Sequence, residues 1–118
     1  MVGLRTKETN DAYKQWDVNN HTKGCVLCDR ESITSFQHWK IIRNDFPYDR
    51  IAQTHHMLVP KRHVPGDYRS LSEDEIAELN TVKQEYLNDH YEYVFEALNH
   101  MQTIPEHFHL HLIVVKEE

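Results

Sequence analysis

The segment from His107 to Ile113 constrains this chain most, because histidine alternates with apolar residues along its whole length. In an extended strand, successive side chains point to opposite faces, so the three histidines would share one face. The apolar residues between them would point the other way, into a core. Imidazole can serve as a nucleophile, a proton carrier or a metal ligand. The pattern therefore predicts a strand over residues 107–115 that carries a row of imidazoles: His107, His109 and His111.

Other segments indicate a mixed fold. Residues 37–43, 53–60 and 91–99 are rich in aromatic and β-branched or other apolar residues, which is typical of strands. Ser72 followed three residues later by Glu75 matches a capping box, and an apolar stripe at helical spacing continues to about residue 89. A short helix is expected over residues 11–16. Strands on either side of one long helix predict an α+β fold with an antiparallel sheet.

Length and charge exclude several classes of protein. A chain of 118 residues is of the size of one domain, and its net charge of −6 argues against a broad nucleic-acid-binding groove. No apolar run approaches the roughly 20 residues of a membrane span, and the first residues lack the apolar core of a secretory signal. We therefore expect a cytoplasmic protein with no membrane and no nucleic-acid polymer as partner.

The alternating segment resembles the signature of the histidine triad (HIT) family, His-φ-His-φ-His-φ-φ with φ apolar. Upstream, residues 44–48 (NDFPY) and 56–64 (HMLVPKRHV) are similar to two further segments of that family and occur in the expected order. The resemblance implies a five-stranded antiparallel sheet with helices packed on one face, usually in a two-fold homodimer. We divide the chain accordingly into an N-terminal arm, residues 1–24, and a HIT domain, residues 25–118.

The resemblance also implies a reaction. The middle histidine, His109, would attack the α-phosphorus of a nucleotide derivative through an unprotonated Nε2, and a nucleotidyl-histidine would form. His111 would hydrogen-bond the phosphate or bridging oxygens as charge develops there. The expected activity is hydrolysis of nucleotidyl phosphoramidates or (di)nucleoside polyphosphates. The alternatives are a nucleotidyl transferase or phosphorylase, and a zinc-stabilised adaptor that binds nucleotide without catalysis.

Five polar residues lie where relatives of the family contact the nucleotide or its phosphate. They are expected to bind substrate in a supporting role: Asn44, His56, Asn99, Gln102 and Thr103. His55 and His56 are neighbours in an expected strand, so at most one of them can face the site.

Cys25 and Cys28 form a Cys-x-x-Cys pair. A redox pair would need a thioredoxin-like βαβ setting, which the sequence does not show. Half of a zinc site is the other interpretation, and it needs two more ligands. The resemblance to zinc-containing members, a Hint-like branch, supplies His63 and His107. Four protein ligands leave no open position, so we expect the Zn²⁺ to be structural.

Overall fold

A five-stranded antiparallel sheet forms the centre of the computed structural model, which describes residues 3–20, 25–102 and 104–117. The strand order across the sheet is β1-β2-β3-β5-β4, and every neighbouring pair is antiparallel. The strands are β1 (Ser32–Ser35), β2 (Trp39–Arg43), β3 (Ala52–Pro60), β4 (Tyr93–Phe95) and β5 (Leu110–Val115). The α+β class and the five-stranded antiparallel sheet are therefore confirmed, although no sequence pattern located β1.

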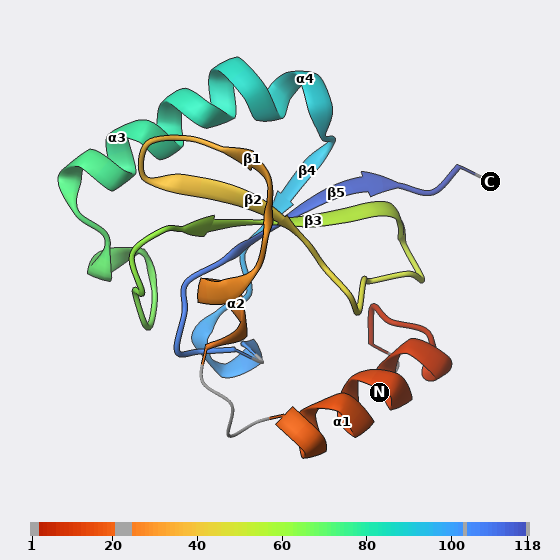
Figure 1. Cartoon of the computed structure of the whole chain (residues 1–118). Helices are drawn as coiled ribbons and strands as arrows, with labels where there is room; N and C mark the ends of the chain where they lie inside the picture. Colours follow the sequence, from red (N-terminus) through yellow and green to blue (C-terminus); the bar gives the residue numbers. More distant parts are fainter. Residues whose placement is uncertain (1–2, 21–24, 103, 118) are drawn as a thin grey trace.

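Helices lie on both sides of this sheet (Figure 1). The predicted long helix is α3 (Glu73–Val82), which continues through a π-helical segment (Lys83–Leu87) into α4 (Asn88–His90) and covers one face. On the opposite face lies α2 (Val26–Asp29), a helix of four residues. A helix this short has no apolar periodicity to detect, so the sequence did not predict it. None of the described helices is both long and apolar enough to cross a bilayer.

The start of α3 has the predicted capping box. The Ser72 hydroxyl accepts a hydrogen bond from the Glu75 amide at 3.1 Å, and a Glu75 carboxylate oxygen accepts one from the Ser72 amide at 2.7 Å. The buried Glu75 carboxylate also pairs with Arg62 at 2.7 Å, and this bond holds the pKa of Glu75 below its usual range. The buried carboxylate of Glu75 thus has hydrogen-bond partners, and its bond to Arg62 connects the start of α3 to the turn that follows β3.

The two faces of the sheet carry separate apolar clusters. Trp39, Ile41 and Leu58 pack with α3 and with the apolar residues of the triad segment: Phe108, Leu110 and Leu112. The predicted inward face of that segment is therefore buried as expected. The opposite face holds a smaller cluster against α2: Leu27, Ile42, Met57 and Val59. Because strand residues alternate between faces, the triad histidines lie on the side of this second cluster.

The strands predicted over residues 37–43 and 53–60 differ from β2 and β3 by at most two residues at one end, whereas three other predicted elements differ more. The last strand begins at Leu110 rather than at residue 107, because the backbone before it bonds elsewhere: the amide of His107 donates to the carbonyl of Ile104 at 3.4 Å and that of Phe108 to the carbonyl of Val64 at 2.6 Å. β4 covers only three residues of the range 91–99. The helix expected over residues 11–16 extends over α1 (Lys7–Asn20).

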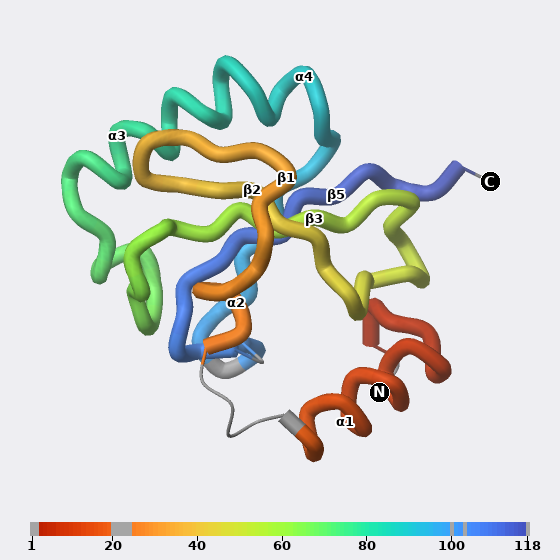
Figure 2. Tube along the Cα trace, viewed as in Figure 1, coloured from red at the N-terminus to blue at the C-terminus, as the bar shows by residue number. Residues whose placement is uncertain are grey.

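The N-terminal arm packs against the loop between β2 and β3. Asp49 in this loop accepts hydrogen bonds from the Thr6 amide at 2.7 Å, the Thr6 hydroxyl at 3.0 Å and the Thr9 hydroxyl. Figure 2 shows α1 beneath this loop, on the same side of the sheet as α2. The division into an arm and a domain stays a prediction, but the described part of the arm is helical and contacts the rest of the chain.

Candidate functional site

The histidines of the triad segment belong to two adjacent clusters rather than to one row. His107 joins Cys25, Cys28 and His63, whose ligand atoms all lie within 4.8 Å of one another. His109 and His111 lie next to each other, with ring centroids 5.0 Å apart, and line a pocket. The same seven-residue segment therefore supplies two chemically different sites.

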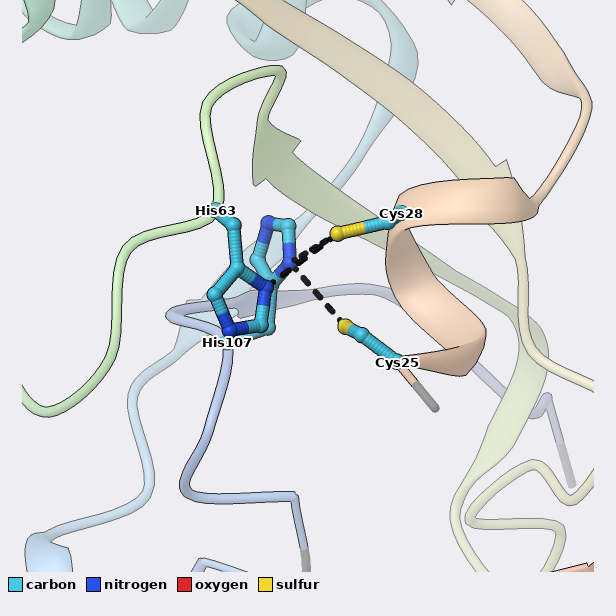
Figure 3. A group of neighbouring side chains, drawn as sticks. All are labelled: Cys25, Cys28, His63 and His107. Carbon is cyan, nitrogen blue, oxygen red and sulfur yellow. Dashed lines mark hydrogen bonds between the residues drawn. The ribbon is translucent and has the colours of Figure 1, made fainter. Parts of the chain in front are cut away.

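The first cluster brings together three parts of the chain (Figure 3). Cys25 is the residue before the short helix α2, Cys28 lies within that helix, and His63 follows β3. His107 precedes β5 and is fully buried. All four residues predicted from the sequence as a metal site are thus brought together by the fold.

Hydrogen bonding leaves the correct nitrogen of His107 available to a metal. Its Nε2 lies 2.9 Å from the carbonyl oxygen of Pro60, and a carbonyl can only accept, so Nε2 carries the proton. The lone pair is then on Nδ1, which lies 3.3 Å from the Sγ of both Cys25 and Cys28. Such a second bond from the far ring nitrogen is the usual way to orient a metal-bound histidine.

The distances suit a tetrahedral ion. Nδ1 of His63 lies 3.2 Å from the Cys28 sulfur. Zinc–sulfur and zinc–nitrogen bond lengths at tetrahedral angles imply S···N separations of roughly 3.6 Å. Burial, together with the neighbouring Cys25, raises the pKa of the Cys28 thiol to about 11, and a bound dication would reverse this and stabilise the thiolate. The donor set and its spacing therefore fit Zn²⁺.

His109 has the opposite arrangement. Its Nδ1 lies 2.9 Å from the carbonyl oxygen of His107, so Nδ1 carries the proton and Nε2 is left with its lone pair. The residue is 8% exposed, and burial lowers its pKa, which keeps the ring neutral near pH 7. An unprotonated ring nitrogen in a pocket has the properties of a nucleophile.

His111 is positioned by a chain of hydrogen bonds that passes through His55. The Tyr48 amide donates to Nδ1 of His55 at 2.9 Å, so Nε2 of His55 carries the proton and donates to Nδ1 of His111 at 2.8 Å. Nε2 of His111 then carries its own proton, 3.3 Å from the Tyr48 hydroxyl. The Nε2–H of His111 therefore faces the Tyr48 hydroxyl, while the residue itself lines the pocket.

Burial also sets the charge of this pair. It lowers the pKa of His55 to about 3 and that of His111 to about 2, with smaller contributions from nearby cationic groups that include Arg5. Both rings are neutral at physiological pH. Each ring of this pair therefore donates or accepts hydrogen bonds according to which of its nitrogens carries the proton, and neither ring carries a charge.

A pocket lies in front of these rings. Apolar and aromatic side chains form much of its wall: Tyr13, Trp16, Val26, Leu27, Phe46, Met57 and Ile104. Its polar groups are the two histidines together with Arg5, Arg30, Arg43, Asn44 and Asp45. An apolar cavity with polar groups near a nucleophile suits a ligand that has a flat apolar part and an ionic part.

The predicted substrate-binding residues divide between the pocket and other places. Asn44 lines the pocket, and its side-chain oxygen accepts a hydrogen bond from the Phe46 amide at 2.8 Å. Asn99 and Gln102 bond each other at 3.4 Å near a short turn (Asn99–Met101) and are not part of the pocket wall. Thr103 lies outside the described residues.

The structure places His55, not His56, beside the triad. His56 points to the α3 side of the sheet, where its Nδ1 lies 2.6 Å from the Tyr91 hydroxyl. Adjacent residues of a strand point to opposite faces of the sheet, so only one of these two histidines can face the triad. Which one does so depends on the orientation of β3 in the folded sheet. The sequence analysis expected His56, rather than His55, to bind the substrate. Tyr48 and the pocket residues of the arm were also missed, because the contacts that bring them there span about 40 residues of sequence or more.

Comparisons with known proteins support the fold. No family model and no curated protein matches the chain. Solved structures do match: a HIT family hydrolase from Legionella pneumophila Philadelphia 1 has a TM-score of 0.56 at 19% identity, over 80% of this chain and 95% of the other. A hypothetical histidine triad nucleotide-binding protein from Sulfolobus tokodaii strain7 has a TM-score of 0.60 at 19% identity, over 80% and 70%.

A third structure, a histidine triad nucleotide-binding protein from Candida albicans, has a TM-score of 0.56 at 18% identity and covers 80% of this chain and 77% of its own. At these identities the similarity establishes a shared fold. The chain therefore has the fold of histidine triad proteins, together with a Cys/His cluster that could hold a metal ion.

Proposed function

We propose that this chain is a HIT-family hydrolase of the Hint-like branch that cleaves nucleotidyl phosphoramidates or (di)nucleoside polyphosphates. One observation carries the proposal: Nδ1 of His109 is bonded to a main-chain carbonyl, so the opposite nitrogen is unprotonated in a residue that lines the pocket. The structural similarity to a HIT family hydrolase supports the same activity.

In the proposed reaction, Nε2 of His109 attacks the α-phosphorus of the bound nucleotide. A nitrogen–phosphorus bond forms while the bond from phosphorus to the leaving amine or phosphate breaks, and the leaving group takes up a proton. Water then attacks the nucleotidyl-histidine, which releases the nucleoside monophosphate and restores the free imidazole. The Nε2 proton of His111 would stabilise the charge that develops on the phosphate or bridging oxygen.

The pocket supports a nucleotide as the ligand. Its apolar and aromatic wall can receive a base, while His109 and His111 form its reactive end. Asn44 is the predicted substrate-binding residue that the pocket contains. The roles of Asn99, Gln102 and Thr103 remain predictions from the family resemblance.

Cys25, Cys28, His63 and His107 would hold one structural Zn²⁺. When bound, the ion would supply only a cross-link between α2, the turn after β3 and the triad segment, because four protein ligands complete its coordination. By binding His107, the ion would also hold in place the His107 carbonyl that bonds Nδ1 of His109.

A two-fold homodimer belongs to the same proposal. The edge strand β4 supports it, since Tyr93 is 55% and Val94 38% exposed. Light scattering of the purified chain tests it, and a monomer at micromolar concentration would count against this part.

Turnover of adenosine 5′-phosphoramidate tests the activity directly. The wild-type chain should release adenosine monophosphate, while His109→Ala should lower kcat by about a thousandfold or more and still bind adenosine monophosphate. Mass spectrometry of the quenched wild-type reaction should detect the nucleotidyl-enzyme. A His109→Ala variant with wild-type turnover would overturn the mechanism. Nucleotide binding without turnover of phosphoramidate or diadenosine polyphosphate would identify an adaptor instead.

A further inference from the structure

The N-terminal arm places an arginine at the candidate nucleotide pocket. Arg5 lines the same cavity as His109 and His111. It precedes α1, 104 residues before His109 in the sequence, and reaches the pocket because the arm packs on the loop between β2 and β3.

Three contacts hold the Arg5 guanidinium in this position. Its Nε donates to the carbonyl oxygen of Phe46 at 2.6 Å, and its Cζ lies 4.7 Å from the ring centroid of Tyr13 and 5.0 Å from that of Tyr48. The hydroxyl of Tyr48 in turn lies 3.3 Å from Nε2 of His111. The charge of Arg5 is therefore stacked on the same ring that contacts the reactive end of the pocket.

The charge of Arg5 is not matched by a nearby acid in the described residues. Arg30 and Asp45, which also line the pocket, pair with each other. Arg5 makes no ion pair within residues 3–20, 25–102 and 104–117. A guanidinium has five N–H donors, and the Phe46 carbonyl uses one.

The rings at the reactive end of the pocket are neutral, so a phosphate charge there can be matched only by the arginines of the pocket wall: Arg5, Arg43 and Arg30, of which Arg30 is paired with Asp45. His55 and His111 are uncharged, and His109 presents a lone pair. Binding an anion in such a place without a cation is costly, whereas arginine binds phosphate oxygens through charge-assisted hydrogen bonds.

We propose that Arg5 binds a phosphate oxygen of the nucleotide held at His109 and His111, so that the N-terminal arm completes the substrate site. This inference rests on the proposed function. It makes the arm a determinant of the substrate class: nucleoside phosphates would be bound in preference to nucleosides.

Calorimetric titration with adenosine monophosphate and with adenosine tests this inference. Arg5→Ala should weaken adenosine monophosphate binding by about tenfold or more and change adenosine affinity by less than about twofold, because only the phosphate contact is lost. Raising the salt concentration should weaken adenosine monophosphate binding less in this variant than in wild type. The matched control is Lys7→Ala, which removes an exposed charge from the same arm and should leave both affinities unchanged.

A second variant separates phosphate binding from docking of the arm. Asp49→Asn weakens the bonds to Thr6 and Thr9 but leaves Arg5 in the chain. If Arg5 acts only by fixing the arm, Arg5→Ala and Asp49→Asn will lower both affinities in parallel and leave the salt dependence at its wild-type value. That result, or wild-type adenosine monophosphate affinity in Arg5→Ala, overturns the inference.

Failure of the inference is distinguishable from failure of the proposed function. If the wild-type chain turns over adenosine 5′-phosphoramidate and Arg5→Ala does so with unchanged KM and kcat, only the role of Arg5 is wrong. If the wild-type chain shows no turnover but binds adenosine monophosphate in an Arg5-dependent way, the role of Arg5 holds and the catalytic proposal is wrong. Absence of adenosine monophosphate binding by the wild-type chain overturns the inference.

Discussion

His107 and His109 are two residues apart, and each donates one hydrogen bond to a main-chain carbonyl, yet they do so through opposite ring nitrogens. His107 uses Nε2 toward Pro60 and leaves Nδ1 for the cysteine sulfurs. His109 uses Nδ1 toward His107 and leaves Nε2 for the pocket. The backbone therefore decides which side chain is suited to a metal and which to a nucleophilic attack, although both are the same residue type in the same pattern.

The largest expected effect, on metal content and stability, comes from removing a histidine of the metal cluster. His63→Ala or His107→Ala should abolish binding of one Zn²⁺ per chain and lower the free energy of unfolding by several kcal/mol, because a structural metal contributes directly to folding. His109→Ala should keep the metal and the stability. Metal analysis and thermal unfolding of the three variants check this, and a His107 variant that retains zinc would contradict the assignment.

A smaller effect is expected from the matched pair on β3. His55→Asn should lower kcat for adenosine 5′-phosphoramidate by about 10- to 100-fold, because His111 loses the partner that sets which of its nitrogens is protonated. His56→Asn, on the opposite face, should stay within about twofold of wild type. Equal losses in the two variants would show that β3 acts only as a scaffold.

The neutral histidines of the pocket predict a pH dependence of stability. The folded-state pKa is about 3 for His55 and about 2 for His111, far below the unfolded value near 6.5. Between these values the unfolded chain binds more protons, so the free energy of unfolding falls as the pH falls below about 6.5.

Each of these histidines contributes a slope of at most about 1.4 kcal/mol per pH unit in that range. Urea unfolding at pH 7, 6 and 5 measures it. His55→Asn should make the slope shallower, because the buried ring is removed. A wild-type slope in this variant would show that the buried ring does not cause the effect.

The smallest expected effect concerns the support of α2. Lys40 donates to the carbonyl oxygens of Cys28 at 3.1 Å and Arg30 at 2.9 Å. Lys40→Met should cost about 1 kcal/mol of stability and leave the zinc content at one per chain, because the ligands themselves are intact. Loss of the metal in this variant would show that Lys40 is needed to place the cysteines.

The α+β class, the capping box and the Cys-x-x-Cys pair could be predicted from local patterns of the sequence. The number of strands and the two histidines of the metal cluster, His63 and His107, came only from the family resemblance. The choice between His55 and His56 could not, because adjacent strand residues differ only in the face they occupy. The position of Arg5 depends on long-range contacts of the arm. The protonated nitrogens of His107 and His109 depend on main-chain carbonyls, which every residue type has and no sequence pattern reveals.

The short helix α2 has a consequence for both sites at once. Cys25 and Cys28 belong to the metal cluster, while Val26 and Leu27, which lie between them in the sequence, form part of the pocket wall. A chelator that strips the ion would therefore also free one wall of the ligand cavity to move. With the Zn²⁺ site proposed above, metal content and ligand affinity are expected to decline together during such a titration.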